Sequence, residues 1–549
     1  MVRQAFQEVG IFLCTTVLPK YGTICGVDMN VTMKRFNTTG PCFPDEHYMM
    51  PALDRLPGVR DLVARGDYFV VHAPRQTGKT TALQALVSEI IAKGDMFALY
   101  CTLESLQNAT DVQMANKIIR ELIVGNAKRI SGFPRDNQLP PAPVDIGQVM
   151  LSVRTVLTDI CDIVGKPVVV FFDEADCLVG DVLISFLRQL RDGYVNRRMI
   201  PFPKSIALVG MLDVRDYRAQ VRPDGQSLGQ ISPFNIIAED MLIPNFTESD
   251  IAALYSQHTA ATGQRFADGV VEAVWRWTRG QPWLVNAIAN DCVAKIHGNR
   301  FDETITVDDV DAAKEAIIRR RDTHVDSLME RMREPRVRRI VEPLISGDKS
   351  DVTYNDDDYR YITDLGLLRV DRGALVPANP MYAEIIGRYL SRGEQDAMIR
   401  SVPETPWVKD DGLDMAGLMA AFQQFWRENS GADKDIMGYR ESVPHLVLMA
   451  FLQRVTNGGG HINREMALGT GRLDLCVEFR GARYAIEVKT SANFQREKSY
   501  AQCAKYLDSL GLSEGWMPIF EKSKEKSWDE KIYSRDETMD GKTIHVIGL

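Results

Sequence analysis

The residues with the clearest chemistry form one short run, Ala73-Pro-Arg-Gln-Thr-Gly-Lys-Thr80, between an apolar segment and an expected helix. The run follows the phosphate-binding pattern G-x-x-x-x-G-K-[ST], with Ala73 in place of the first glycine. Backbone N–H groups from Gly78 to Thr81 and the helix N-terminus would hold phosphate oxygens. Lys79 would neutralise phosphate charge, and Thr80 would offer its hydroxyl to Mg²⁺. Because a strand and a helix flank the run in the required order, it predicts a nucleotide-binding site rather than a chance Gly-Lys-Thr.

A pair of acids, Asp173-Glu174, ends a second apolar run. The carboxyl ends of parallel strands meet at one edge of a sheet, so the pair is expected beside the phosphate-binding run. Asp173 would hold the hydration shell of Mg²⁺, and Glu174 could polarise an attacking water. Together, the two motifs predict nucleotide binding and hydrolysis.

A third group of candidate catalytic or metal-binding residues lies near the C-terminus, on two segments in which polar and apolar residues alternate. Asp474 points away from the apolar face of 472–479, and Glu487 and Lys489 share one face of 484–489. Two carboxylates suit Mg²⁺ or Mn²⁺, and an ammonium group can position water or stabilise charge on a phosphate. The sequence therefore predicts a metal-dependent phosphodiesterase site.

An amphipathic surface hairpin is the alternative interpretation, because it would also place these three charges outside. Two details favour a site: the opposite face of 485–489 is apolar, and Gln502 and Tyr506 follow one turn apart on an expected helix.

The elements that must position these residues alternate between strands and helices. Apolar runs predict strands at 68–71, 96–102, 167–174 and 206–212, with helices at 51–65, up to residue 93, and within 103–165. This alternation predicts an α/β fold class with a parallel sheet. After Pro244 the pattern is helical up to about residue 321, and Gly280-Gln-Pro-Trp283 opens a helix.

The C-terminal half predicts smaller units. Residues 322–392 combine helices with a hairpin at 367–376, which favours a winged helix over a helical insertion. Expected beyond the linker 401–417 are helices at 418–428, 441–455 and 494–510, strands at 472–479, 484–489 and 516–520, and a solvated helix or loop at 521–530.

The segment 35–392 resembles the AAA+/STAND branch of P-loop NTPases, and in particular bacterial AAA-like ATPases. The likeness lies in Phe36-Asn-Thr-Thr-Gly-Pro-Cys, Asp173-Glu-Ala-Asp, the Gly280-x-Pro282 turn and the winged-helix pattern. The resemblance implies ATP, Mg²⁺, Pro282 near the base or phosphates, and a sensor residue after strand 206–212, for which Asp213 is the candidate. The first glycine of the family's motif is missing. No arginine finger can be chosen among Arg191, Arg197 and Arg198, and for each of them a surface charge at a helix end is the favoured interpretation.

The segment 430–525 resembles the PD-(D/E)xK phosphodiesterase superfamily, in particular its RecB-type nuclease branch. The resemblance implies that Asp474 and Glu487 ligate the metal, with Glu441 at an additional acidic position. It further implies that Lys489 acts on water or phosphate and that Gln502 and Tyr506 organise the site. His445 is either an extra ligand or a structural histidine of a helix face.

Six parts are expected along the chain. They are an N-terminal extension (1–34), a P-loop ATPase core (35–240), a helical lid (241–321), a winged helix (322–392), a linker (393–428) and a PD-(D/E)xK nuclease-like α/β domain of restriction-endonuclease type (429–549). The apolar stretch 9–27 is interrupted by Pro19 and Lys20 and lacks a convincing cleavage site, so it is not interpreted as an export signal.

Charge and composition limit the partners of the 549-residue chain. A net charge of −9 argues against a protein that coats nucleic acid, and residues 401–549 carry 19 basic and 22 acidic side chains, a net charge of −3. The densest basic strip is Arg319–Arg321 with Arg331, Arg333, Arg336, Arg338 and Arg339. This strip is either a solvated helix face or a contact for a duplex backbone. Nine scattered cysteines favour a reducing, cytoplasmic compartment, and no apolar run is long enough for a membrane span.

These observations predict an ATPase fused to a metal-dependent nuclease that acts on nucleic acid, with DNA as the first expectation and Mn²⁺ as a second candidate metal. The alternative is a STAND-type ATP switch or adaptor whose last domain binds nucleic acid or protein without cleavage. A homo-oligomer is a further expectation from the first resemblance.

Overall fold

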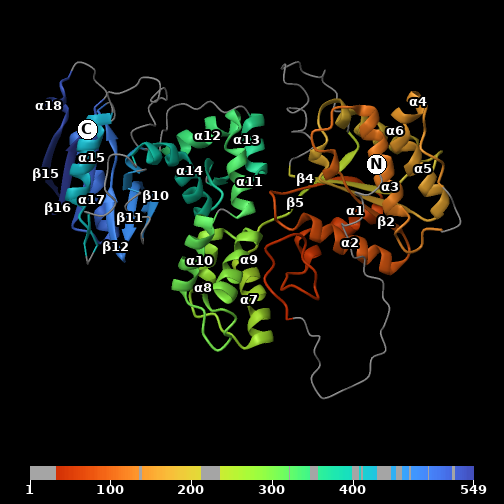
Figure 1. Ribbon diagram of the computed structural model, residues 1–549, viewed down its shortest axis with the longest axis horizontal. Coiled ribbons are helices and arrows are strands. Elements are labelled where there is room, and N and C mark those ends of the chain that lie inside the picture. Colours follow the sequence, from red (N-terminus) through yellow and green to blue (C-terminus); the bar gives the residue numbers. More distant parts are fainter. Residues whose placement is uncertain are drawn as a thin grey trace, which may run out of the picture.

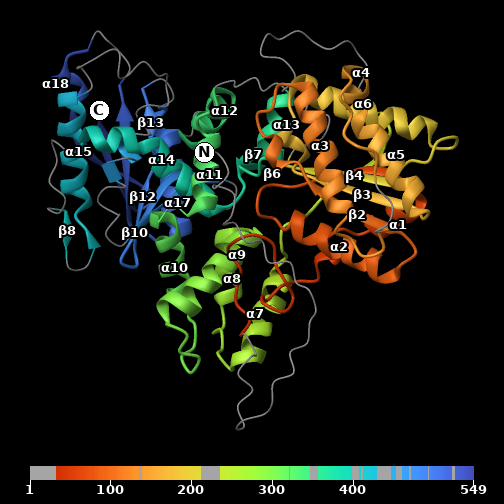
Figure 2. The same cartoon turned by 45° about the vertical axis from the view of Figure 1, so that its right-hand side comes forward.

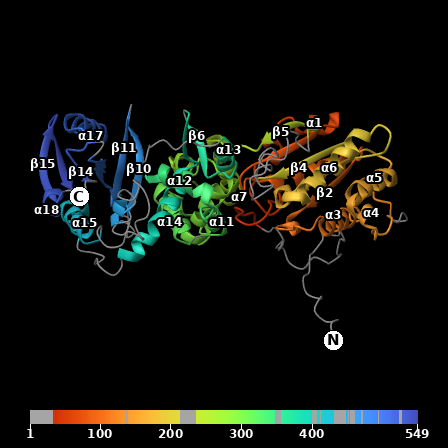
Figure 3. The ribbon, with the colours of Figure 1, turned by 90° about the horizontal axis from the view of Figure 1, so that it is seen from above.

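The computed structural model describes residues 33–134, 139–211, 235–320, 322–346, 356–371, 373–398, 407–409, 412–429, 447–449, 451–452, 460–468, 471–491, 494–521 and 526–549. Three parts follow one another along its long axis: a core with a parallel sheet, a helical middle part and a second sheet (Figures 1 and 3). The structure is therefore mixed α/β, as predicted.

The first sheet has five strands, all parallel to their neighbours, in the order β2-β3-β4-β1-β5. The strands are β1 (Tyr68–His72), β2 (Phe97–Thr102), β3 (Val168–Asp173), β4 (Ser205–Gly210) and β5 (Ile237–Leu242). The four predicted strands are confirmed. Strand β5 was not predicted, because its sequence is largely exposed and contains two acidic residues.

Helices cover both faces of this sheet, which is why β3 and β4 are buried along their whole length. Phe69 and Val71 of β1 pack toward α1 and α2, whereas Val70 packs toward α3, α5 and α6. The helices are α1 (Val59–Arg65), α2 (Lys79–Lys93), α3 (Val112–Ala127), α4 (Ile146–Met150), α5 (Ser152–Val164) and α6 (Gly180–Asn196). Short 3-10 turns lie at Ala52–Arg55, Glu104–Leu106 and Ala175–Cys177.

The prediction of one helix over 51–65 was wrong. The segment instead forms the 3-10 turn Ala52–Arg55 and then α1, because Gly58 has a φ of 84° and interrupts the helical backbone before Val59. A left-handed residue cannot continue a right-handed helix.

The middle part is helical, as predicted, and shares one continuous core with α3, α5 and α6 (Figure 2). Its elements are α7 (Glu248–Thr262), α8 (Val270–Thr278), α9 (Pro282–Asn290), a π-helical turn (Asp291–Ile296), α10 (Val307–Arg320), α11 (Thr323–Arg331), α12 (Pro335–Ser346), α13 (Asp356–Asp364), β6 (Leu368–Asp371), β7 (Ala374–Pro377) and α14 (Pro380–Met398). The β6–β7 hairpin confirms the predicted strand pair. Leu390 of α14 packs against this core and also against that of the second sheet.

The second sheet is mixed and has the order β10-β11-β12-β14-β16-β15, with the short β13 beside β14. Its strands are β10 (Gly460–Leu468), β11 (Gly471–Phe479), β12 (Ala482–Ile486), β13 (Lys489–Thr490), β14 (Glu514–Phe520), β15 (Tyr533–Met539) and β16 (Lys542–Gly548). Helix α15 (Met415–Asn429) covers one face and α17 (Arg496–Leu510) the other. The hairpin β8–β9 (Val408–Lys409, Gly412–Leu413) and α18 (Trp528–Lys531) complete the described elements.

The prediction of one continuous strand over 484–489 was wrong. The pairing of β12 ends at Ile486 and resumes only at Lys489, in β13. The amide of Val488 donates instead to the side chain of Asp474, at 2.9 Å. A carboxylate that takes a backbone N–H in this way competes with the strand ladder.

Within the described residues, no helix combines the length and the apolar character that a membrane span requires.

Candidate functional site

The phosphate-binding run forms the turn between β1 and α2. Gly78, with a φ of 97°, is the N-cap of α2, and Gln76 is also in the left-handed region, with a φ of 57°. Lys79 is buried, and its Nζ donates to the carbonyl oxygens of Ala73 (2.8 Å) and Pro74 (3.0 Å). Burial lowers the pKa of Lys79. The loop therefore holds the ammonium group of Lys79 within its own turn. This places backbone N–H donors and a positive charge together at the N-terminus of α2.

Asp173 lies at the end of β3 and contacts the start of α2, although β4 separates β3 from β1 in the sheet. The hydroxyl of Thr80 donates to Oδ2 of Asp173 at 2.7 Å. The hydroxyl of Tyr100, from β2, donates to the same oxygen at 2.8 Å. The structure thus brings together the predicted Thr80 and Asp173 and adds Tyr100, whose place on an apolar strand gave no signal in the sequence.

Glu174 follows Asp173 with a φ of 55°, a conformation that is costly for a residue with a side chain. Its backbone N–H donates to Oδ1 of Asp173 at 3.0 Å, and it lines the same cavity as Lys79. Burial, and then the charge of Asp176, raises the pKa of Glu174. A carboxylate with a raised pKa is a stronger base.

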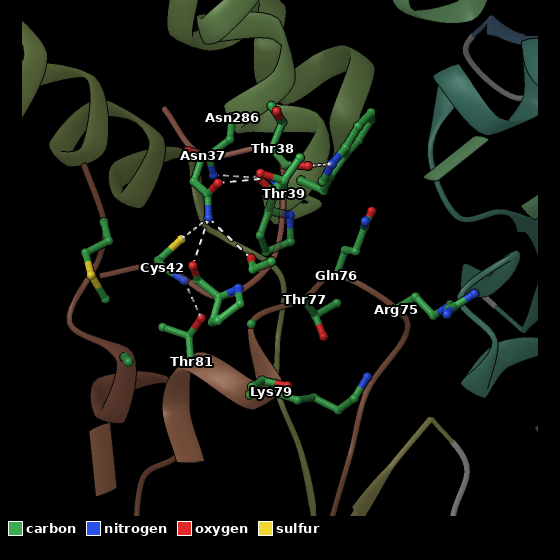
Figure 4. Close-up of a pocket in the computed structure, with 18 of the residues that line it drawn as sticks. Asn37, Thr38, Thr39, Cys42, Arg75, Gln76, Thr77, Lys79, Thr81 and Asn286 are labelled. Carbon is green, nitrogen blue, oxygen red and sulfur yellow. Dashed lines mark hydrogen bonds between the residues drawn. The ribbon is translucent and has the colours of Figure 1, made fainter. Parts of the chain in front are cut away.

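A cavity of about 320 Å³ extends from the phosphate-binding loop to the segment 37–42 and to α9 (Figure 4). Its walls come from segments that are far apart in the chain. They include Asn37–Cys42, Tyr48–Met50, Arg75–Thr81, Glu174 and Pro282, Trp283 and Asn286 of α9. A cavity that joins a phosphate-binding loop to an apolar wall has the shape and chemistry of a nucleotide site.

The segment 37–42 is held in place from two sides. Nε1 of Trp283 donates to the carbonyl of Thr38 at 2.8 Å, and the amide of Cys42 donates to Oγ1 of Thr81 at 3.0 Å. Asn37 closes the segment through its Nδ2, which donates to the carbonyl of Pro41 at 3.1 Å. The side chain of Thr81, predicted to bind the cofactor, therefore positions this segment.

Arg55 is a site residue that the sequence did not reveal. Its Nη1 donates to the carbonyl of Thr77 at 2.6 Å, its Nη2 donates to the carbonyl of Pro244, and its guanidinium lies over the ring of Phe246. Burial lowers its pKa to about 10. Arg55 thus joins the phosphate-binding loop to the connection between β5 and α7. A single arginine in a 3-10 turn is not part of any periodic pattern, so the sequence could not predict that it joins these two segments.

The helical middle part also reaches the phosphate-binding loop. Nη1 of Arg75 donates to Oγ of Ser327 in α11 at 2.7 Å. Gly366 lies against the loop so closely that a Cβ atom there would be 2.5 Å from Cγ of Pro74.

The C-terminal candidate residues also lie together. Asp474 accepts the amide of Val488, and Nζ of Lys489 donates to Oε1 of Glu487 at 2.7 Å. Glu487 is 1% exposed, and among the residues that the structure describes none is a hydrogen-bond partner of its Oε2. Burial, and then the charge of Asp474, raises the pKa of Glu487 to about 7. A buried carboxylate oxygen without a donor is an atom that a cation would satisfy.

Helix α17 closes this second site. Nε2 of Gln502 donates to the hydroxyl of Tyr506 at 2.8 Å, so the two predicted helix residues do face one another. Ile486 and Val488 point to the opposite core, as predicted. Within the described part of the chain, no three His, Cys, Asp or Glu side chains are arranged to hold a metal.

Three predicted residues, Asp213, Glu441 and His445, lie outside the described residues. Among the arginine-finger candidates, Arg197 stacks on Tyr194 at 3.6 Å, which suits a structural role.

The predicted basic strip is largely neutralised. Each of its described arginines has an acidic partner, in the pairs Arg319–Glu315, Arg320–Asp322, Arg331–Glu334, Arg333–Glu330, Arg336–Glu334, Arg338–Glu342 and Arg339–Asp358. These pairs favour the solvated helix face over the duplex contact.

No family model and no curated protein sequence matches the chain. Solved structures that align with part of it include the Walker-type ATPase PABY2304 of Pyrococcus abyssi, with 14% identity, a TM-score of 0.45, and coverage of 64% of this chain and 99% of that one. Cdc6p of Pyrobaculum aerophilum aligns with 13% identity and a TM-score of 0.34 over 61% of this chain and 93% of its own. The RuvB Holliday junction branch migration motor of Thermotoga maritima aligns with 13% identity and a TM-score of 0.31 over 59% and 89%. With TM-scores below 0.5, these similarities do not establish a family.

Proposed function

We propose that the chain binds ATP with Mg²⁺ and hydrolyses it in the cavity between β1, α2 and α9. The observation that carries this proposal is the contact of Thr80 with Asp173 beside the buried Lys79, at one end of that cavity. Hydroxyl and carboxylate oxygens are ligands that Mg²⁺ or its bound waters accept. The backbone amides of the loop can donate hydrogen bonds to phosphate oxygens. The bound metal would withdraw charge from the phosphates.

The protein's own groups have separate roles in this proposal. Lys79 and the amides of the loop orient the triphosphate, and Glu174 holds the attacking water and receives its proton. The raised pKa of Glu174 suits that role, because a stronger base takes the proton more readily. Trp283 and Pro282 contact the nucleoside from α9, and the segment 37–42 covers it.

The roles predict different defects for two variants. Lys79→Ala should lose ATP binding by at least tenfold, whereas Glu174→Gln should bind ATP and lose most of its turnover. Lys93→Ala, at the other end of α2, is the matched control and should behave like the wild type. Equal ATP turnover in all four proteins would refute the assignment.

A second candidate function is metal-dependent cleavage of a phosphodiester, most plausibly in DNA, at Asp474, Glu487 and Lys489. The partnerless oxygen of Glu487 favours it, because a cation would complete that site. In this proposal the two carboxylates hold Mg²⁺ or Mn²⁺, and Lys489 orients water or stabilises charge on the phosphate. The residue ranges given above for the ATPase core, the lid, the winged helix and the nuclease-like domain are likewise proposals.

A plasmid assay with Mn²⁺ tests the second function. The wild type should nick the plasmid, and Asp474→Ala and Lys489→Ala should not. Arg483→Ala, an exposed change on β12, is the control and should nick normally. If all four proteins nick equally, the site is not the source of the activity. If none does, an ATP-dependent switch or adaptor that binds without cutting becomes the better account.

A further inference from the structure

Tyr100 lies in β2 on the face that α2 covers. Its Cα partner in β3 is Phe171, two residues before Asp173, and alternate residues of a strand share a face. The phenol therefore extends along the sheet toward the end of β3, where its hydroxyl lies 2.8 Å from Oδ2 of Asp173. Thr80 of α2 reaches the same oxygen from above the sheet.

The carboxylate of Asp173 is held by three donors. Oδ2 accepts the hydroxyls of Thr80 and Tyr100, and Oδ1 accepts the amide of Glu174 at 3.0 Å. An ionised carboxylate has about four acceptor positions, so one remains, on Oδ1. Asp173 is 1% exposed, so these donors from the protein, rather than bulk water, hold its carboxylate.

We propose that Tyr100 is a positioning residue for the metal that accompanies the nucleotide. It fixes the carboxylate of Asp173 and occupies the second acceptor position on Oδ2, so that Oδ1 keeps an open position, which would face the hydration shell of the metal. This inference rests on the proposed ATP site. Partners of this outer kind orient a metal's surroundings and affect its affinity without contacting it.

A purely packing role would not need the hydroxyl, because phenylalanine fills the same space. The hydroxyl donates to Oδ2 of Asp173 at 2.8 Å, and phenylalanine would lose this contact.

The test compares Tyr100→Phe with Tyr68→Phe, in the full chain. Tyr68 is a matched control, because it lies in the same sheet and its hydroxyl donates to a carbonyl, that of Pro203, at 2.9 Å. The dissociation constant of ATP is measured by calorimetry in Mg²⁺ and in EDTA. In Tyr100→Phe, the gain in affinity that Mg²⁺ provides should fall by roughly tenfold, with the EDTA value unchanged. Tyr68→Phe should keep the full gain.

The variant Asp173→Asn distinguishes a failure of the inference about Tyr100 from a failure of the proposed ATP site. If it reduces the Mg²⁺ gain and Tyr100→Phe does not, the inference about Tyr100 is overturned while the ATP site stands. If Asp173→Asn also keeps the full gain, or the wild type does not bind ATP, the proposed function itself fails. A loss of affinity in Tyr100→Phe that is equal in Mg²⁺ and in EDTA would show a packing role and overturn the inference.

Discussion

The ammonium group of Lys489 lies 2.7 Å from one oxygen of Glu487, and the other oxygen has no hydrogen-bond partner in the described part of the chain. With Asp474 close by, two carboxylates share one ammonium, so the group carries a net negative charge when all three are ionised. The pKa shifts of both partners agree with this net negative charge. The pKa of Glu487 is raised, so it resists ionisation. Burial lowers the pKa of Lys489, but the two carboxylates outweigh burial and raise it. A cation, which the proposed nuclease function requires, would balance this charge.

This charge distribution predicts a pH-dependent stability of the second sheet. The pKa of Glu487 rises from an ordinary 4.5 to about 7 in the folded chain. The folded state therefore binds more protons between these values, and stability is lost as the pH rises from about 4.5 to about 7. In EDTA at pH 8, Glu487→Gln should slow amide hydrogen exchange in β12 and β14, whereas at pH 4 it should have little effect. The exposed Glu514→Gln is the control; slowing of the same size there would contradict the prediction.

The contact of Gly366 with Pro74 predicts a coupling between the helical middle part and the phosphate-binding loop. Gly366 and Gly373 both have left-handed φ values, 72° and 81°, but a Cβ atom would meet Pro74 only at position 366. Each change to alanine should cost roughly 1–2 kcal/mol of backbone strain. Only Gly366→Ala should also weaken ATP binding, by several-fold, as measured by titration. Similar ATP affinities in both variants would show that the contact does not affect the loop.

Gly280 allows a backbone contact that no other residue would permit. Its carbonyl accepts the amide of Phe246 at 2.8 Å, and a Cβ atom would lie 1.8 Å from the carbonyl oxygen of Phe246. Gly280→Ala should therefore lower the midpoint of thermal unfolding much more than Gly263→Ala, whose Cβ would meet nothing within 4 Å. Equal midpoints for the two variants would mean that this turn is not held as described.

Trp283 and Trp277 differ in what their indole N–H groups hold. Trp283 donates to the carbonyl of Thr38 at the cavity, and Trp277 donates to Asp311 away from it, both at 2.8 Å. Changed to phenylalanine, each should lose one hydrogen bond, or about 1 kcal/mol. Trp283→Phe alone should weaken ATP binding, by about fivefold. The prediction fails if Trp277→Phe weakens it equally.

Local patterns were sufficient to predict the strands and the loop at the first site. The order β1, loop, α2 follows from an apolar run and a helix start, and the register that brings Asp173 to Thr80 follows from parallel strands ending at one edge. The contributions of Tyr100 and Arg55 could not be predicted in this way. Each depends on a contact between elements distant in the sequence, and neither residue type is unusual at its position.

The second site shows a different limit of sequence patterns. Alternation placed Asp474, Glu487 and Lys489 together correctly, but it also implied an unbroken strand at 484–489. The side chain of Asp474 takes the amide of Val488, and this long-range competition with the ladder has no local signature. Strands β15 and β16 were not predicted either. The polar, mostly exposed sequence of β15 gives little strand signal, whereas β16 is largely buried.

Leu390 gives the chain a mechanical property. Because this side chain touches both hydrophobic cores, helix α14 cannot tilt relative to one of them without opening a gap at the other. A change in the relative orientation of the two ends of the molecule would therefore require the side chains around Leu390 to repack.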